Sequence, residues 1–407
     1  MTDTTTPIVL TAPRQRWWAV ISAALAMLLM AAIAVSVLIP AELFAKADNP
    51  RLGVQQAAPY ARVPASAESV NDRVVYNDLP DDVEVYDTNG DFFFVTVSAP
   101  TQSLLSWLIG ANEPVVDPLT EEGKYGNLTP TQSRQVSLQQ MRTATEEAQY
   151  VALLTAGYEP TVEPGEVIIQ DILCRVTAEN GDCEEPFPSD EQLDPADTIL
   201  EVDGVPIGTL ADLSEELDGR SPGDMVDLKI SRPDVGELDV TVELSTAIEE
   251  PDRTIVGFVP FDTASVDLPF DVSIDSGAIG GPSAGLAFTL ALIDELTEGD
   301  LTGGRDIAVT GTIDLEGNVG AIGGLEQKVS AVKQHGVDVF LIPASQFELG
   351  EPFEGEEPGE ICRWECLNAA GDDDVVLIPV ANVNEALIAL RFLGGDPVVP
   401  VNADDAA

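Results

Sequence analysis

An uncharged run of 23 residues, Trp17 to Ile39, most constrains what this chain can fold into. At about 1.5 Å per residue, a helix of this length crosses a hydrocarbon core of about 30 Å. Arg14 and Arg16 precede the run, and basic residues mark the cytoplasmic end of a span. The sequence therefore predicts a cytoplasmic tail over residues 1–16, a single-pass transmembrane anchor over 17–39 and an extracellular remainder. Ala45-Lys46-Ala47 resembles a signal-peptidase site, so a cleaved signal is the alternative, although the apolar run is longer than a typical signal core.

The chain is strongly acidic. Of its 407 residues, 71 are Asp or Glu and 19 are Lys or Arg, which gives a formal net charge of -52. Such a field opposes contacts with nucleic-acid phosphates, which need clustered basic side chains. The acidity therefore predicts no nucleic-acid partner. It indicates either a solvated, self-repelling surface or a surface that attracts cationic peptides.

Four cysteines form two local pairs, Cys174 with Cys183 and Cys362 with Cys366. Three pairings of four cysteines exist in principle, and the two local disulfides are the simplest outside the membrane, where disulfides persist. Zinc is the alternative. Neither spacing is Cys-x-x-Cys and no histidine lies near either pair, so we expect no metal.

Ser283 lies in Gly280-Gly281-Pro282-Ser283-Ala284-Gly285, directly before an apolar stretch from Ala284 to Leu296. Glycine and proline favour a tight turn there, and the apolar stretch favours a helix. The first turn of a helix leaves backbone N–H groups without partners, and such groups can stabilise the oxyanion of a tetrahedral intermediate. The pattern indicates a serine nucleophile, with a plain loop before a helix as the alternative.

A serine hydroxyl needs a neighbouring base, and this chain offers few. Its only histidine, His335, ends an apolar-periodic run before Gly336, which is typical of a helix C-terminus. Lys328 follows a pair of glycines and begins a helix face that can be buried. Burial lowers the pKa of a lysine towards neutrality, so Lys328 is the predicted base. Lys333 lies about 140° further round the same helix and is predicted to face solvent.

From Pro269 onward the sequence resembles the proteolytic domain of the Lon proteases, a Ser–Lys dyad family. The matching segments occur in the family's order, and they are Gly281–Gly285, Ile307–Ile313, Gly317–Val319, Ile322–Gly324, Lys328 and Val339–Pro343. The resemblance implies that Ser283 is the nucleophile, that Lys328 is the general base and that Thr310 orients the lysine. It also implies supporting roles for Gly281 and Gly323. Glu326 stands where ATP-dependent members usually have lysine, a position outside the dyad.

No Gly-x-x-x-x-Gly-Lys-[Ser/Thr] motif occurs in the sequence, which predicts a protease without a nucleotide-driven motor. Without a motor, the enzyme must take substrates that are already flexible or exposed. We expect neither a nucleotide nor any other cofactor.

A second resemblance is to PDZ domains. It rests on a strand and turn over Asp197–Ile207, a helix over Leu210–Leu217 with Thr209 and Asp212 as caps, and closing strands over Met225–Ser231 and Leu238–Leu244. Ala196 replaces the commoner glycine before Asp197.

PDZ domains bind an extended peptide along a sheet edge beside a helix, and backbone N–H groups hold the terminal carboxylate. The resemblance places that edge at Glu166 to Ile172, and the predicted peptide-binding residues are Gly165, Glu166, Val167 and Ile168. A structural spacer without a ligand is the alternative.

These features predict an α/β (α+β) Lon-type proteolytic domain with an inserted β-rich PDZ domain and one N-terminal transmembrane helix. Residues 40–82 are expected to form an extracytoplasmic tether, because Ala, Pro and polar residues are common there. Asn89-Gly90 predicts a hairpin within Val83–Val97, and apolar spacing predicts a helix over Gln132–Ala156. The expected boundaries are 83–158 for the N-terminal part of the protease region, 159–248 for the PDZ domain, 251–400 for the Lon proteolytic domain and 401–407 for a tail. The acidic stretch Glu348–Asp374 is expected to be a solvated loop.

An anchor, a PDZ module and a motorless Lon-type domain together resemble the bacterial membrane-bound PDZ–Lon proteases, some of which process secreted peptide pheromones. The resemblance implies an ATP-independent serine endopeptidase at the outer face of the cell membrane, acting on flexible peptides or on segments of secreted and membrane proteins. A homo-oligomer is left open, because rings are usual among Lon relatives. The alternative is a catalytically silent anchored scaffold whose PDZ module gathers envelope proteins. The joint presence of Ser283, Lys328 and Thr310 argues against it.

Overall fold

The computed structural model describes residues 14–48, 55–126, 129–163, 165–177, 183–232, 235–247, 254–262, 265–346 and 375–401. These residues fall into two compact units. The first contains the described residues up to 48 together with 55–63 and 98–124, and the second contains 64–97 and the described residues from 125 onward. The predicted disulfide Cys362–Cys366, the acidic stretch Glu348–Asp374 and nearly all of the predicted tail lie outside the described residues.

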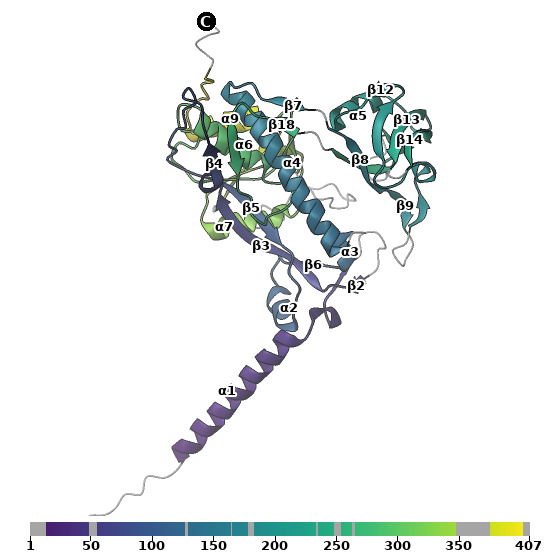
Figure 1. Cartoon of the computed structure of the whole chain (residues 1–407). Coiled ribbons are helices and arrows are strands. Elements are labelled where there is room, and N and C mark those ends of the chain that lie inside the picture. Colours follow the sequence, from purple (N-terminus) through teal and green to yellow (C-terminus); the bar gives the residue numbers. More distant parts are fainter. Residues whose placement is uncertain are drawn as a thin grey trace, which may run out of the picture. The chain divides into compact units, whose positions relative to one another are not determined.

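The first unit begins with α1 (Arg14–Leu38), a single long helix (Figure 1). Within it, Trp17–Leu38 has a mean hydropathy of 2.6 and none of it is buried, so α1 is long and apolar enough to cross a membrane. Short elements follow in the same unit: η1 (Ala41–Leu43), β1 (Lys46–Asp48), β2 (Gln55–Ala57), α2 (Leu104–Gly110), β6 (Asp117–Leu119) and most of α3 (Glu121–Tyr125). β1 pairs with β2, and the first residues of β3 (Tyr60–Ser69) pair with β6, both antiparallel.

The described residues between 40 and 82 do not form the predicted tether. They hold β1, β2 and β3, then η2 (Asn71–Arg73) and β4 (Val74–Asn77), and the side chains of Ala58, Ala61, Ala67 and Val70 are buried. The composition was misleading because alanine is common both in solvated linkers and in closely packed interiors.

A mainly parallel sheet organises the second unit, in the order β24–β23–β20–β5–β3. Its parallel strands are β5 (Phe92–Ser98), β20 (Ile307–Val309), β23 (Val339–Pro343) and β24 (Val376–Val380). Their nearly continuous apolar sequences suit a sheet that is covered on both faces. β5 and β20 are neighbours although about two hundred residues separate them, so the sheet joins segments from both sides of the predicted PDZ segment.

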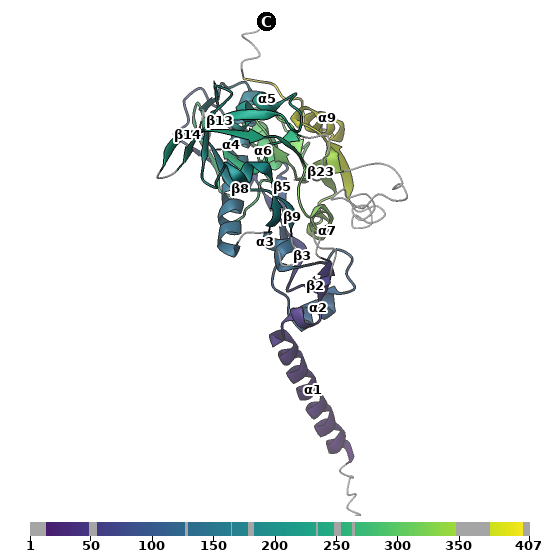
Figure 2. The same cartoon turned by 90° about the vertical axis from the view of Figure 1, so that its right-hand side faces the viewer.

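Helices cover both faces of this sheet (Figure 2). On one face, Phe94 and Val309 pack in a core with α4 (Pro130–Ala156), α6 (Gly285–Leu296) and α9 (Val383–Leu393). On the other face, Ala308 and Phe340 pack against α7 (Leu325–His335). Because side chains alternate along a strand, each strand supplies residues to both cores. The prediction of a helix over Gln132–Ala156 is confirmed by α4.

The predicted hairpin around Asn89-Gly90 is wrong. β5 is the only strand between Val83 and Val97. Asn89 instead donates its side-chain N–H to Asp300 Oδ2 at 3.1 Å, and a Cβ added to Gly90 would lie 2.2 Å from the Arg305 carbonyl oxygen. The glycine therefore permits a close backbone approach, which is the other common reason for glycine in an apolar segment.

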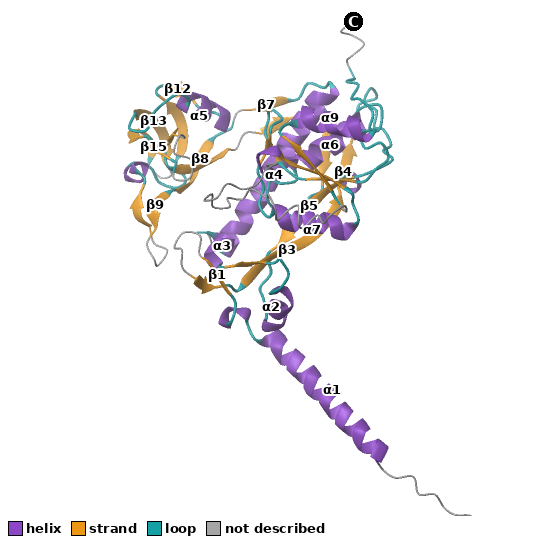
Figure 3. Ribbon diagram, turned by 180° about the vertical axis from the view of Figure 1, so that it is seen from behind, coloured by secondary structure: helices purple, strands orange, loops and turns teal. Residues whose placement is uncertain are grey.

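A β-rich module, residues 161–267, lies in the sequence between α4 and the turn that carries Ser283, and its described residues contain one α-helix (Figure 3). Its sheet has the order β14–β13–β11–β8–β17, with β12 paired to β11. The elements are β7 (Thr161–Glu163), β8 (Val167–Ile172), β9 (Cys174–Thr177), β10 (Cys183–Pro186), η3 (Pro188–Glu191), β11 (Thr198–Val202), β12 (Val205–Pro206), α5 (Leu210–Leu217), β13 (Met225–Arg232), β14 (Gly236–Glu243), β15 (Ser245–Thr246), β16 (Thr254–Ile255), β17 (Phe258–Asp262) and β18 (Ser265–Asp267).

As predicted, Thr209 and Asp212 cap α5. The Asp212 N–H donates to Thr209 Oγ1, and the Thr209 N–H donates to the Asp212 carboxylate, which forms a capping box.

Short elements surround the turn that carries Ser283. β19 (Asp271–Ile274) pairs with β4 ahead of the turn, and β21 (Thr312–Ile313) pairs with β22 (Val319–Gly320) after β20. η4 (Ala344–Gln346) follows β23.

Candidate active site

Ser283 lies in a turn that ends at α6, in the position the sequence predicts. Gly281 has φ +90°, a left-handed conformation that favours glycine. Its N–H donates to the Ser137 carbonyl of α4 at 2.7 Å, which ties the turn to the core. Every residue of α6 is buried, so the helix holds the turn on a rigid base.

The turn leaves backbone donors next to the serine hydroxyl. The N–H groups of Gly285 and Leu286 are bonded to the carbonyls of Pro282 and Gly311. Within the described part of the chain, the N–H groups of Ser283 and Ala284 have no hydrogen-bond acceptor. Unpaired N–H groups ahead of a helix can donate hydrogen bonds to an oxyanion.

The side chain of Lys328, which lies on α7, contacts the Ser283 hydroxyl. Gly324, at the N-cap of that helix, has φ +69°, and Lys328 lies in the first turn with only 2% of its surface exposed. Its Nζ atom is 2.7 Å from Ser283 Oγ and 2.9 Å from Thr310 Oγ1. The structure thus brings together the three side chains that the sequence singles out.

Burial controls the charge of this amine. Removal from water disfavours the ammonium form and lowers the pKa of Lys328 to about 7. Among the described residues, no carboxylate raises the pKa of Lys328 against this effect, and desolvation is its one cause. Near neutral pH a large fraction of Lys328 is therefore the free amine.

Thr310 fixes the direction of the hydrogen bonds at this centre. It is fully buried at the end of β20, and its N–H donates to the Leu341 carbonyl of β23 at 3.0 Å. Its hydroxyl donates to the Ser283 carbonyl at 3.1 Å, so the hydroxyl oxygen is left to accept an N–H from Lys328. The lone pair of the neutral amine then remains for the Ser283 hydroxyl proton.

The turn before α7 shows no steric need for glycine at Gly323, because a Cβ added there would meet nothing within 4 Å. The supporting role of Gly323 stays a prediction. The left-handed residue in this turn is the next one, Gly324. The sequence also gave no sign of Gln346, whose buried side chain both donates to and accepts from the Ile322 backbone at 2.7 Å. These two hydrogen bonds hold the turn that leads into α7 in place.

The remaining basic candidates lie where the sequence predicts. His335 ends α7, where its Nε2 accepts the Ala67 N–H at 3.4 Å and its Nδ1 lies 2.9 Å from the Ala331 carbonyl oxygen. Gly336 has φ +75° and closes the helix. Lys333 is exposed. Neither side chain reaches Ser283.

The predicted peptide-binding edge of the β-rich module is not open. Val167 and Ile168 pair with β11 on one side and with Asp262 and Phe261 of β17 on the other. The Gly165 N–H, expected to hold a carboxylate, donates to the Gly208 carbonyl at 2.8 Å. Glu166 is exposed beside this closed edge. The prediction failed because β17 comes about ninety residues after β8, and no local pattern reports such a pairing.

Cys174 is disulfide-bonded. Its predicted partner, Cys183, begins β10, which pairs antiparallel with β9, the strand that Cys174 begins. The Cys183 side chain lies outside the described residues, so the pairing Cys174–Cys183 stays a prediction.

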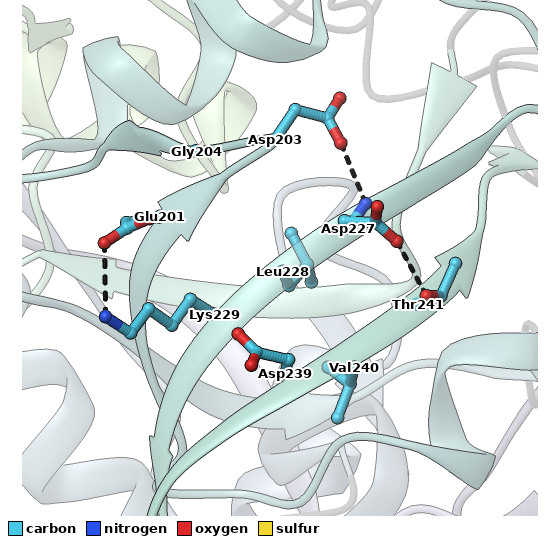
Figure 4. A pocket seen from close by; sticks show the side chains of 9 residues that line it. All are labelled: Glu201, Asp203, Gly204, Asp227, Leu228, Lys229, Asp239, Val240 and Thr241. Atoms are coloured by element: carbon cyan, nitrogen blue, oxygen red, sulfur yellow. Dashed lines mark hydrogen bonds and ion pairs between the residues drawn. The ribbon is translucent and has the colours of Figure 1, made fainter.

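A pocket of about 480 Å³ lies on the sheet of the β-rich module, and four of its nine lining residues are acidic (Figure 4). Three of its four carboxylates have partners within the chain: Glu201 lies 3.3 Å from Lys229, Asp203 accepts the Asp227 N–H at 2.9 Å, and Asp227 accepts the Thr241 hydroxyl at 2.7 Å. The lining residues are Glu201, Asp203, Gly204, Asp227, Leu228, Lys229, Asp239, Val240 and Thr241. The pocket shares no residue with the group around Ser283.

Comparison with known proteins matches two domains in this chain. Residues 262–349 match the Lon protease (S16) C-terminal proteolytic domain, and residues 157–244 match the PDZ domain. The predicted fold class is thereby confirmed.

Several curated relatives are Lon proteases. "Lon protease" of Mesomycoplasma hyopneumoniae is 32% identical over 155 residues, which is 35% of this chain and 17% of the relative. "Lon protease 2" of Thermus thermophilus is 31% identical over 141 residues, 32% of this chain and 17% of the relative. "Lon protease" of Clostridioides difficile is 34% identical over 118 residues, 26% of this chain and 15% of the relative. The chain thus spans less than a fifth of the length of these relatives.

Among solved structures, the PDZ domain of an SdrC-like protein from Listeria monocytogenes aligns with a TM-score of 0.19 and 15% identity, over 24% of this chain and 88% of that one. A solution structure from Geobacillus thermodenitrificans aligns with a TM-score of 0.17 and 20% identity, over 22% of this chain and 95% of that one.

Proposed function

From a chain that carries a Lon-type proteolytic domain and a PDZ domain, we propose a serine endopeptidase in which Ser283 is the nucleophile and Lys328 the general base. One observation carries the proposal. A buried lysine with its pKa lowered to about 7 lies 2.7 Å from the hydroxyl of a serine at the start of a buried helix. A positioned base of this pKa is suited to proton transfer at neutral pH.

The proposed reaction has two halves. The lone pair of neutral Lys328 takes the hydroxyl proton while Ser283 Oγ attacks the peptide carbonyl carbon, and the N–H groups of Ser283 and Ala284 hold the oxyanion. The lysine ammonium then gives its proton to the leaving amine as the C–N bond breaks, which leaves an ester on Ser283. Water, deprotonated by Lys328, hydrolyses the ester and releases the acid product.

Thr310 acts as a positioning residue in this proposal. Its hydroxyl donates to the Ser283 carbonyl at 3.1 Å and accepts an N–H of the Lys328 amine at 2.9 Å. Holding the amine in one orientation lowers the entropic cost of reaching the attack geometry.

We further propose that the enzyme needs no nucleotide and is anchored by α1 with its catalytic region on the outer face of the membrane. The absence of a Walker A motif from the 407-residue sequence supports the first point, and the apolar helix preceded by Arg14 and Arg16 supports the second. Substrates are then flexible peptides or exposed protein segments, because nothing in this chain supplies energy for unfolding.

The test uses the full chain in detergent and β-casein, an unstructured protein, without ATP. Ser283→Ala and Lys328→Met should each lower cleavage by at least about a thousandfold, because a nucleophile and its base act as one unit. Lys333→Met, the same change at the exposed lysine of α7, should leave cleavage unchanged. Retention of more than about a tenth of the parent rate in either dyad variant would contradict the proposal.

A further inference from the structure

Large apolar side chains lie on the outside of the first unit, next to the end of α1. The small apolar cluster there is built on three buried alanines, and Trp107 of α2 packs against it. Phe44, directly after η1, stacks on Trp107 with the ring centroids 6.3 Å apart. Four larger side chains on these neighbouring elements, here called the apolar group, are exposed by half or more, and they are Leu43, Phe44, Leu108 and Ile109. An exposed group of this kind indicates contact with an apolar partner.

Backbone hydrogen bonds hold α2 against the residues that follow α1. The Leu104 N–H donates to the Ile39 carbonyl at 2.8 Å, and the Ala41 N–H donates to the Gln102 carbonyl at 2.9 Å. α2 also contacts both α1 and η1 (Figure 1). Because α1 ends at Leu38, the first residue of α2 is bonded to the residue directly after that helix. The apolar group therefore lies at the level where the apolar helix ends.

The sequence around α2 carries no charge, although the net charge of the chain is -52. No Asp, Glu, Lys, Arg or His occurs between Asp91 and Glu113, and α2 itself reads Leu-Leu-Ser-Trp-Leu-Ile-Gly. Tryptophan is enriched where a membrane meets water, and an uncharged segment enters that region without the cost of desolvating a charge. The place, the composition and the exposure of the apolar group thus favour a lipid surface as its partner.

We propose that η1, Phe44 and α2 insert the apolar group into the boundary between headgroups and acyl chains of the outer leaflet. The first unit then touches the membrane through a second contact besides α1. Interfacial helices bury their apolar side chains about 5–10 Å into this boundary. The contact depends on apolar burial and needs no anionic lipid. The proposal rests on the proposed anchoring by α1 and does not require the Ser283–Lys328 dyad.

The test is nitroxide spin labelling of the full chain reconstituted in phosphatidylcholine vesicles. Ile109→Cys places a label in the apolar group, and Leu28→Cys places one in α1. Val235→Cys, in the turn between β13 and β14, is the control because Val235 is 63% exposed and Ile109 is 66% exposed. The unsubstituted chain gives the background from its own four cysteines. Electron paramagnetic resonance measures how often each label collides with O₂ and with a polar nickel complex.

The nickel complex should reach the Ile109 label at least about fivefold less often than the Val235 label, because a polar solute is excluded from an apolar phase. O₂ should reach both labels. If the Ile109 label behaves like the Val235 label while the Leu28 label is shielded from nickel, the anchoring stands and this proposal is overturned. Nickel access to the Leu28 label would contradict the anchoring and the proposal together. A label at Ile109 that neither reagent reaches, or dipolar broadening between two labels, would show that protein covers the apolar group and would also overturn the proposal.

A second substitution tests whether apolar burial holds the contact. Leu108→Glu, added to the labelled Ile109→Cys chain, should raise nickel access to the label towards that of Val235, because a charge opposes insertion. Leu154→Glu is the matched control on α4, since Leu154 is 52% exposed and Leu108 is 53% exposed. It should leave nickel access unchanged. A label that stays shielded in Leu108→Glu would count against the proposal.

Discussion

At the scale of single residues, the Lys328 environment explains why one lysine among five is fit to act as a base. The amine lies among buried groups, and within the described part of the chain its hydrogen-bond partners are two hydroxyl oxygens, of Ser283 and Thr310. A hydroxyl stabilises an ammonium far less than a carboxylate does. Desolvation therefore outweighs hydrogen bonding and lowers the pKa.

Thr310→Val keeps the shape of the residue and removes its hydroxyl. We expect kcat to fall by about 10- to 100-fold, because the amine loses the acceptor that orients it. The same loss disfavours the ammonium, so the rising limb of the pH–rate profile should move to lower pH. A kinetic pH series on the parent, Thr310→Val and Thr310→Ser measures this, with Thr310→Ser expected to restore the parent midpoint.

Thr297→Val is the matched control, since Thr297 is also buried and its hydroxyl donates only within α6, to the Ile293 carbonyl at 2.7 Å. It should leave the midpoint in place. A midpoint that stays fixed in Thr310→Val would show that Thr310 does not position the amine.

The backbone at Ala196 is strained, at a position where the sequence already departs from the commoner glycine. Its φ is +75°, a conformation that costs a residue with a Cβ about 1–2 kcal/mol. Glycine is commoner at this place in PDZ domains, and Ala196 is exposed, so nothing in the packing requires the methyl group. Ala196→Gly should stabilise the PDZ domain by about 1 kcal/mol, measured by urea unfolding. A destabilised variant would contradict the strain argument.

At the scale of elements, α6 contains a buried acid that the reaction does not use. Asp294 is fully buried, its Oδ1 accepts the Leu301 N–H at 2.7 Å, and its Oδ2 has no hydrogen-bond partner among the described residues. Burial raises the pKa of Asp294 from 3.8 to about 7. The folded protein therefore holds a proton that the unfolded chain has already lost between these two pH values.

It follows that this carboxyl makes the folded state less stable as pH rises from about 4 to about 7, with no further loss above. Asp294→Asn does not ionise, so it should unfold at a higher temperature than the parent at pH 8, and the difference should shrink towards pH 4. Thermal unfolding across this range is the measurement. Asp271→Asn, at an exposed position on β19, is the control. If the pH dependence of Asp294→Asn ran parallel to that of the parent, Asp294 would not be the titrating group.

The elements that could be predicted are those whose signal is local. The turn before α6, the capped helix α5 and the amphipathic α4 each follow from neighbouring residues. Asn89-Gly90 led to the wrong prediction of a hairpin, because the same dipeptide occurs in hairpin turns and where another backbone segment approaches closely. The pairing of β17 with β8 was missed because the partner strand is distant in sequence, and Gln346 because its role depends on a contact across the fold.

At the scale of the whole molecule, a net charge of -52 surrounds a site that depends on an uncharged amine. A negative field favours the ammonium form, which opposes the proposed mechanism. Surface charges are screened beyond about 8 Å at physiological ionic strength. Since Lys328 is 2% exposed, its own desolvation is the stronger effect. The acidic surface and the buried base are thus compatible.

The pH dependence of acylation tests the central claim most directly. A small activated ester that acylates serine is added to the full chain at fixed times from pH 5 to 10, and mass spectrometry quantifies the adduct on Ser283. The pKa of Lys328 near 7 predicts a rate that rises about tenfold per pH unit below neutrality and levels off above it. Lys328→Met should lack this slope and form almost no adduct. A rate that keeps rising to pH 10, or full acylation in Lys328→Met, would contradict the account.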